Sequence, residues 1–293
     1  RPATASRVIP IRSSGIRPPL YCFDPSGSHV LTYRPLADAL SLEQPVFGID
    51  TSDFWDLSRE SLSVAEFAEE YADMLIEFQP EGAFHLIGWS KGGVIALATA
   101  QTLERRGRMV KFLGIMDTHV QMLAEDDERF EGLSPYLLCL PEEHQREMLA
   151  LDTRELHRLQ QELQELPEHQ RLSHAIRWAA CRGYVPKDLP MDVVVRSCMI
   201  TQGTRALMEA IRCAPIMAPI TGWWCDETLH RYGGAPIDWA AYTTGGVGIH
   251  TANSDHMHLL GDPQVHDTLD RTLKSLSIAG SVPEYSNHVN EAP

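Results

Sequence analysis

Ser90 is the residue of this sequence whose type and surroundings point most directly to chemistry. It lies in HLIGWSKGG (residues 85–93), where a short apolar run ends at a glycine and a segment rich in helix formers, VIALATAQTLERRG, follows. This pattern predicts a strand, a sharp turn and a helix, with Ser90 at the turn. A bend this tight admits only small neighbours, which Gly88, Gly92 and Gly93 supply. We therefore expect the turn to present Ser90 to a ligand.

A serine hydroxyl becomes a useful nucleophile only with a base in hydrogen-bond reach, and that base needs an orienting carboxylate. Hydrolases with a strand–turn–helix serine carry these groups in the order Ser, acid, His. Asp117 ends the strand predicted after the helix that follows Ser90, so both residues should lie at one edge of a parallel sheet. His256, between the last strand and the last helix, is the predicted base. Asp226 also follows a predicted strand and is the alternative acid.

Other histidines compete with His256 for the role of base. His250 and His258 lie close to it in sequence, and three such histidines raise the question of a metal site. No Cys or Glu cluster accompanies them, and zinc sites usually bring a recognisable second pair of ligands. We therefore predict no metal site, and we interpret His258 and His85 as structural or surface groups.

An oxyanion hole needs two backbone N–H groups aimed at the carbonyl oxygen on which charge develops. One is expected from Lys91, the residue after the nucleophile. The other is expected from the loop after the first strand, with Ser26 as the donor and Gly27 as the alternative. The Lys91 side chain is not needed for this role, and we interpret its charge as a surface feature.

The elements that must position these residues alternate between strand and helix. Short apolar runs predict strands at residues 19–23, 45–49, 83–87, 110–116 and 214–224. Helical spacing and a capping pattern predict helices at residues 33–40, 63–78, 94–107 and 263–276. This alternation predicts an α/β fold, in which a mostly parallel sheet is covered by helices on both faces.

The composition changes along the chain and suggests its organisation. Residues 121–197 are rich in Glu, Gln, Leu, His and Arg and contain amphipathic helical patterns without a strand. We predict that they form a helical lid inserted into a core made of residues 18–120 and 198–278. Residues 1–17, rich in Pro, Ser, Gly and Arg, are predicted to be a linker in a longer polypeptide. Residues 279–293 are predicted to be a C-terminal tail.

The overall composition excludes some classes of function. The chain has 293 residues, with 25 basic and 40 acidic side chains and a net charge of −15, which would repel the phosphates of nucleic acid. It has no secretory signal and no 18-residue apolar span, so we expect no membrane association. Its six cysteines lie far apart without a C-x-x-C pair, which favours free thiols and a cytoplasmic location.

Several of these motifs, in this order and spacing, resemble the thioesterase domains that terminate nonribosomal peptide synthetases and related polyketide synthases. The matching features are PSGS at 25–28, GWSKGG at 88–93, MDT at 116–118, the helical insertion, and DHMHLL at 255–260. The resemblance covers roughly residues 18–276 and implies an α/β-hydrolase fold with a helical lid.

The resemblance also implies a reaction and a partner. A peptidyl or acyl chain would arrive as a thioester on the phosphopantetheine arm of an upstream carrier domain, move to Ser90, and leave by attack of water or of an internal nucleophile. The domain itself would hold no cofactor. The resemblance fits both release by hydrolysis and release by macrocyclisation.

The resemblance also implies alternatives to this interpretation. The family places its acid at the position of Asp117, whereas stand-alone editing (type II) thioesterases place it at Asp226, so such an enzyme or a serine esterase is the alternative. A non-enzymatic module that binds a carrier or partner through the lid is a second one. The sequence departs from the family at Ser254, where glycine is common, and in its longer insertion.

Overall fold

The computed structural model describes residues 7–24, 29–52, 64–118, 133, 151–185 and 190–278. The chain divides into two compact units. The first comprises Arg1–Thr51, Phe67–His119 and Ile211–Pro293, and the second comprises Ser52–Glu66 and Val120–Ala210. All residues of the candidate site that the structure describes belong to the first unit.

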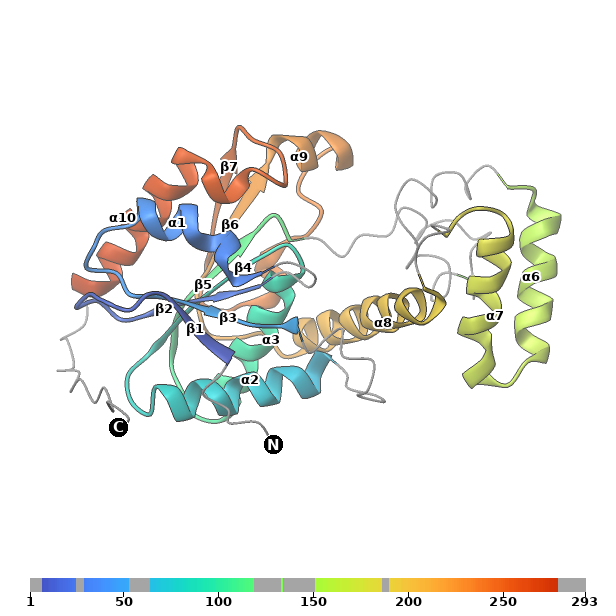
Figure 1. Cartoon of the computed structure of the whole chain (residues 1–293), viewed down its shortest axis with the longest axis horizontal. Coiled ribbons are helices and arrows are strands. Elements are labelled where there is room, and N and C mark those ends of the chain that lie inside the picture. The colour runs from blue at the N-terminus through green and yellow to red at the C-terminus, as the bar shows by residue number, and fades with distance from the viewer. Residues whose placement is uncertain are drawn as a thin grey trace. The chain divides into compact units, whose positions relative to one another are not determined.

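A seven-stranded sheet forms the centre of the first unit. Its strands are β1 (Val8–Arg12), β2 (Leu20–Phe23), β3 (Val46–Ile49), β4 (Phe84–Trp89), β5 (Val110–Met116), β6 (Ile220–Cys225) and β7 (Val247–Ala252). Their order is β1-β3-β2-β4-β5-β6-β7, with β1 antiparallel to β3 and all other neighbours parallel (Figure 1). Every residue of β2 and β4 is buried, as expected for central strands covered on both faces.

Helices cover both faces of this sheet (Figure 1). One face packs against α1 (Arg34–Ala39) and α10 (Pro263–Ile278), whose apolar residues join those of the strands in one buried cluster. The other face packs against α2 (Val64–Phe78) and α3 (Lys91–Arg105), and Tyr71 of α2 meets Phe23 of β2 at a ring-centroid distance of 6.0 Å. The predicted α/β architecture with a mostly parallel sheet is therefore confirmed.

Four more short helices lie in the described part of the first unit: η2 (Val30–Tyr33), α9 (Asp226–Tyr232), η5 (Trp239–Tyr242) and η6 (Leu259–Gly261). The sequence patterns did not indicate α9, which is only seven residues long and follows β6 without a loop. Its position proves important for the candidate site. Among the described residues, no helix combines the length and the apolar content needed to cross a membrane.

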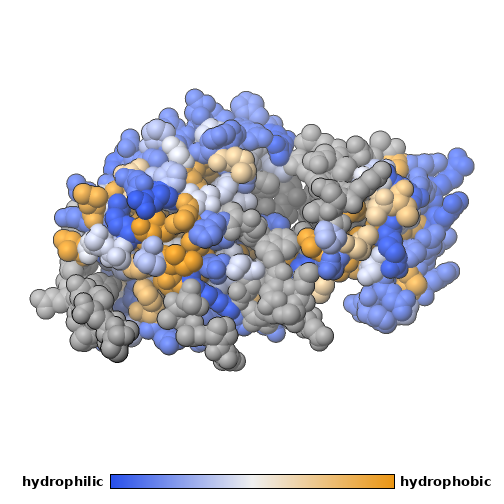
Figure 2. Space-filling view, in the orientation of Figure 1, coloured by the Kyte–Doolittle hydropathy of each residue, from blue (hydrophilic) through white to orange (hydrophobic). Residues whose placement is uncertain are grey.

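The second unit contains α6 (Thr153–Glu165), α7 (Glu168–Cys181) and most of α8 (Met191–Cys213). Asp152 caps α6 by accepting a hydrogen bond from the Arg154 N–H at 3.0 Å. Buried residues of these helices form a separate apolar core, which includes Leu156, Leu159, Leu163, Ala175, Ile176 and Ala179. The exposed side chains of α6 are mostly polar, and Figure 2 shows a hydrophilic surface there. This is the amphipathic pattern that predicts a helical insertion.

The boundaries of the insertion differ from the predicted lid of residues 121–197. Helix α8 continues without interruption to Cys213, so the predicted boundary at 197 falls inside a helix. The apolar stretch predicted as a strand at 214–224 begins its strand only at Ile220. The segments 121–132, 134–150 and 186–189 lie outside the described residues, as does the predicted tail at 279–293.

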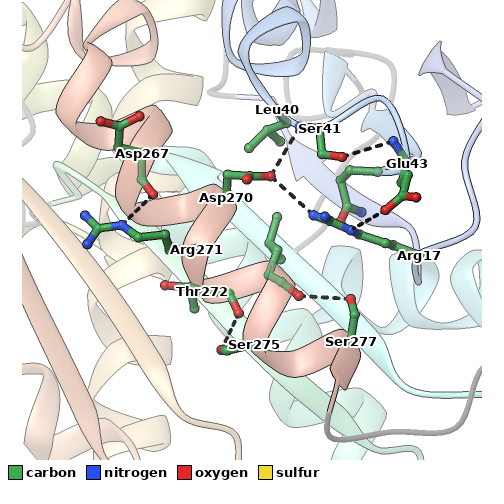
Figure 3. Close-up of polar contacts among 12 residues, drawn as sticks. Arg17, Leu40, Ser41, Glu43, Asp267, Asp270, Arg271, Thr272, Ser275 and Ser277 are labelled. Carbon is green, nitrogen blue, oxygen red and sulfur yellow. Dashed lines mark hydrogen bonds and ion pairs between the residues drawn. The ribbon is translucent and has the colours of Figure 1, made fainter.

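The N-terminal segment also differs from the prediction. Residues 1–17 are predicted to be a linker, but residues 8–12 form β1, whose Val8 and Ile11 are buried. The linker prediction is wrong there because a short strand at a sheet edge needs few apolar residues, and proline is tolerated at such an edge. Arg17 forms ion pairs with Glu43 and with Asp270 of α10 (Figure 3).

Candidate active site

Ser90 lies at the bend between β4 and α3 in a strained backbone conformation. Its φ of 55° and ψ of −132° are rarely adopted by a residue other than glycine. Three hydrogen bonds hold the bend: the Ser90 N–H donates to the Met116 carbonyl at 2.9 Å, and the Ser90 carbonyl accepts from the Gly93 N–H at 3.0 Å and the Thr118 hydroxyl at 2.7 Å. Such strain, of order 1–3 kcal/mol, persists because the surrounding structure imposes it.

The glycines around Ser90 are required by close contacts, as the sequence pattern indicates. A Cβ atom at Gly88 would lie 2.2 Å from the carbonyl oxygen of Gly92. One at Gly92 would lie 2.3 Å from the carbonyl oxygen of Phe23, and one at Gly93 would lie 2.1 Å from the hydroxyl oxygen of Thr118. These contacts bring the start of α3 down onto β2 and β4, which sharpens the bend at Ser90.

Asp117 lies at the same edge of the sheet as Ser90. In the register of the parallel strands Trp89 pairs with Met116, and Met116 pairs with Trp223. The residues that follow these strands therefore emerge side by side. Asp117 also has a positive φ of 44°, and its N–H donates to the Trp223 carbonyl at 2.7 Å.

Asp117 and His256 form a short hydrogen bond although they are 139 positions apart in the sequence. The distance from Asp117 Oδ2 to His256 Nδ1 is 2.6 Å, the carboxylate is fully buried, and 28% of the imidazole is exposed. Because Nδ1 faces a carboxylate, it carries the proton, which leaves Nε2 as the acceptor in the neutral ring. An imidazole in this tautomer can serve as a general base.

The Asp117 carboxylate receives further hydrogen bonds from Cys225, the last residue of β6, and from Thr228 of α9. Oδ1 accepts from the Cys225 N–H at 3.2 Å, and Oδ2 accepts from the Thr228 hydroxyl at 2.8 Å and from the Cys225 thiol at 3.1 Å. Burial by itself would raise the pKa of Asp117, but hydrogen bonds from His256, Cys225 and Thr228 outweigh it, and the pKa is lowered. Asp117 is therefore an anion at neutral pH.

His256 also lies beside the residue that precedes the serine. Its ring contacts the indole of Trp89 with a centroid distance of 5.1 Å and an interplanar angle of 35°. Its backbone N–H donates to the Glu227 carboxylate of α9 at 3.3 Å. These contacts bring His256, from a loop near the end of the chain, to the edge of the sheet where Ser90 and Asp117 lie.

The other candidate residues lie elsewhere. The His250 ring stacks on Trp223, and His258 Nδ1 bonds the Asp255 carboxylate at 2.8 Å. His85 is buried within β4. Asp226, the alternative acid, is the first residue of α9 and is half-buried.

The predicted oxyanion-hole donors are only partly described. Lys91 is the first residue of α3, so its backbone N–H lies at the N-terminal end of that helix, and its side chain is exposed. Ser26 and the alternative Gly27 lie outside the described residues.

Cys225, Thr228 and Trp89 were not singled out from the sequence. Cys225 and Thr228 lie on either side of the alternative acid Asp226 in the segment WWCDET, and the carboxylate is the group in this segment whose type predicts a catalytic role. No local pattern marks a threonine as a partner of a residue 111 positions away. Trp89 is the last apolar residue of a buried strand, so its sequence position indicates a core residue as readily as a contact of the site.

Comparison with known proteins shows the family of this chain and supports its fold. The family model of the thioesterase domain matches residues 18–275. The chain is 37% identical over 113 residues to malpibaldin synthetase of Mortierella alpina, a match that covers 39% of this chain and 2% of the synthetase. It is 26% identical over 268 residues to chondramide synthase cmdD of Chondromyces crocatus, covering 89% of this chain and 7% of that protein. The chain thus spans only a small fraction of these relatives.

Among solved structures, a covalent complex of the NocB thioesterase domain with a fluorophosphonate nocardicin G analogue aligns with a TM-score of 0.56. The two chains are 19% identical, and the alignment covers 92% of this chain and all of the other, which supports the same fold. The chain belongs to the thioesterase domain family, with an α/β-hydrolase fold. It is a serine hydrolase-type thioesterase of the kind found in nonribosomal peptide synthetases.

Proposed function

We propose that this domain releases a finished peptidyl or acyl chain from a carrier domain, with Ser90, His256 and Asp117 as its catalytic triad. The observation that carries the proposal is the 2.6 Å hydrogen bond between a fully buried Asp117 and His256, at the sheet edge where Ser90 occupies a strained bend. A histidine oriented by a buried carboxylate beside such a serine is the arrangement that nucleophilic acyl transfer needs.

In the first half of the cycle the serine takes the acyl chain. His256 Nε2 removes the Ser90 hydroxyl proton as the oxygen attacks the thioester carbonyl, and Asp117 stabilises the imidazolium that forms. The backbone N–H groups of Lys91 and Ser26 would hold the tetrahedral oxyanion. The C–S bond then breaks, the imidazolium proton passes to the departing sulfur, and an ester on Ser90 and a free thiol remain.

In the second half the ester is released. His256 removes a proton from water, or from an amine or hydroxyl of the chain itself, as that group attacks the ester carbonyl. Collapse of the second tetrahedral intermediate returns the proton to Ser90 and yields a linear acid or a ring. Because a thiolate leaves more easily than an alkoxide, we expect this half to be slower, so the acyl-enzyme should accumulate.

The thiol partner that fits this cycle is the phosphopantetheine arm of a peptidyl or acyl carrier domain upstream of residue 1. The relatives support this proposal, since malpibaldin synthetase and chondramide synthase cmdD are large synthetases of which this chain covers only 2% and 7%. The acyl chain is thus substrate, and the thioesterase domain needs no cofactor of its own.

Turnover of soluble thioesters tests the proposal. Peptidyl and acyl N-acetylcysteamine thioesters should be converted by the wild-type domain, and the Ser90→Ala variant should lose about 10³-fold or more of that activity. Ser275→Ala, at a serine on α10 whose hydroxyl donates to the Thr272 carbonyl at 2.7 Å, is the matched control and should retain full activity. Full turnover by Ser90→Ala would refute the proposal.

The same reactions distinguish the two modes of release. Mass spectrometry of the products separates a linear acid from a ring, which is lighter by one water. A substrate that carries an internal amine or hydroxyl should be included beside one that lacks it, because only the first can cyclise. A product mixture that depends on this group would identify the domain as a cyclase.

A further inference from the structure

We propose that the last residue of β6 and the first turn of α9 hold the acid of the triad in place, with Thr228 of α9 as a positioning residue for Asp117. The inference rests on the proposed function, because it concerns how the triad is assembled. The Thr228 hydroxyl donates to Asp117 Oδ2 at 2.8 Å, the same oxygen that accepts from His256 Nδ1 at 2.6 Å. The Cys225 N–H donates to the other oxygen at 3.2 Å.

The number of available protons makes Thr228 the main side-chain donor. Its single O–H is used by Asp117, and its oxygen can then accept from the Cys225 thiol, which lies 3.3 Å away. The same thiol lies 3.1 Å from Asp117 Oδ2, but one S–H serves one acceptor at a time. A thiol is also a weak donor, so the hydroxyl contributes more to holding the carboxylate than the thiol does.

Burial explains why the carboxylate needs these donors. The Asp117 side chain has no exposed surface, so water cannot supply the hydrogen bonds that an anion requires. The terminal torsion of an aspartate is broad, so packing alone does not fix the plane of its carboxylate. Donors on both oxygens, one from the Cys225 backbone and one from Thr228, set this plane, and Oδ2 then faces His256 Nδ1.

The fold brings Thr228 to this place through the register of two strands. Met116 of β5 pairs with Trp223 of β6, so the chain leaves β6 two residues further on, beside Asp117. Helix α9 starts at once, and its first turn buries Thr228 at 4% exposure, whereas Glu227 is exposed. The segment that carries the rival acid Asp226 therefore supplies hydrogen-bond donors to Asp117.

Substitutions at Thr228 separate a positioning role from a packing role. Thr228→Val keeps the shape but removes the donor, and Thr228→Ser keeps the donor but removes a methyl group. We expect Thr228→Val to lower kcat roughly 10- to 100-fold with KM changed by less than about twofold, because misplacement of a catalytic group affects the chemical step. Thr228→Ser should stay within about threefold of wild type.

A proton NMR signal gives a readout that packing alone would not move. The His256 Nδ1 proton, shared with Asp117, should resonate far downfield and should be absent in His256→Ala and Asp117→Asn. We expect this resonance in the wild type and in Thr228→Ser, and expect it shifted or broadened in Thr228→Val. If Thr228→Val does not fold, Thr228→Ala takes its place, with folding checked by its melting temperature.

The outcomes distinguish this inference from the proposed function. Wild-type kcat and an unchanged resonance in a folded Thr228→Val would overturn the positioning role and leave the triad intact. Equal loss of kcat in Thr228→Val and Thr228→Ser would also overturn it. Serine keeps the hydroxyl of threonine and valine lacks it, so an equal loss would show that the hydroxyl does not determine kcat. Full activity of Ser90→Ala would instead refute the proposed function itself.

Discussion

At the scale of single residues, the site depends on backbone strain and buried charge. Ser90 and Asp117 are the non-glycine residues with positive φ in the described part of the chain, and both directly follow neighbouring strands. Such strain marks positions where the fold forces a residue out of its preferred conformation, and it often occurs at active sites. Its occurrence at both predicted triad positions supports a shared role.

The choice between the two candidate acids can be tested directly. Asp117→Asn should lower kcat by about 10³- to 10⁴-fold, because an amide can no longer orient the imidazole in the tautomer that the base needs. Asp226→Asn alters a half-buried residue at the start of α9 and should stay within about threefold of wild type. Steady-state kinetics with one thioester substrate gives both values. The reverse ranking would assign the acid to Asp226 and favour an editing thioesterase.

At the scale of elements, the site is built at the ends of four neighbouring strands, β4, β5, β6 and β7, and by the residues that follow them. Much of this could be predicted from sequence, because Gly88–Ser90–Gly92 between an apolar run and a helix is a local signal. The order of Ser90, Asp117 and His256 along the chain also predicted their roles, because hydrolases with a strand–turn–helix serine carry these groups in the order Ser, acid, His. The contribution of Thr228 could not be predicted, since it depends on which residue of β6 pairs with Met116. Likewise β1 was missed, because its pairing with β3 compensates for a weak local pattern.

The close packing of α3 on the sheet leads to a prediction at this scale. Gly92→Ala should destabilise the domain by about 1–3 kcal/mol and reduce kcat, because the new methyl group would meet the Phe23 carbonyl oxygen at 2.3 Å. Urea unfolding and thioester kinetics measure the two effects.

A glycine in an open helical position serves as the control. Gly203 lies inside α8, and a Cβ there would find Val64 Cγ2 at 3.8 Å, an ordinary contact distance. Gly203→Ala should therefore be neutral or stabilise by about 0.5–1 kcal/mol, since alanine favours a helix interior. Equal destabilisation by the two substitutions would show that the Phe23 contact does not determine the effect.

At the scale of the whole molecule, the site exists only while the sheet of the first unit is intact. Asp117 and His256 are far apart in sequence, and β4, which carries Ser90 at its end, lies in the middle of the sheet. That strand also contains His85, which is 1% exposed. Among the described residues, neither ring nitrogen of His85 has a hydrogen-bond partner. Protonation of His85 would therefore destabilise the folded sheet.

This buried histidine predicts a loss of stability in acid. Burial, assisted by the charge of Lys111, lowers the pKa of His85 from 6.5 to about 4. Below about pH 6.5 the unfolded chain binds a proton there that the folded protein rejects, so stability falls with pH until about pH 4. Over this window the loss amounts to about 3 kcal/mol.

Urea unfolding of wild type and His85→Leu at about pH 7 and about pH 4 isolates this contribution from other titrating groups. The wild type should lose about 3 kcal/mol more than the variant between the two pH values. An equal loss in both proteins would mean that His85 takes up its proton as readily in the folded state as in the unfolded state, for example because solvent reaches the ring.

The acyl-enzyme is the species on which the whole account depends, and mass spectrometry observes it directly. The wild-type domain, mixed with an acyl N-acetylcysteamine thioester and quenched in acid, should gain the mass of one acyl group, located on the peptide that contains Ser90. The adduct should be absent from Ser90→Ala and should form far more slowly in His256→Ala. Turnover without any adduct, or an adduct of equal yield in Ser90→Ala, would contradict the account.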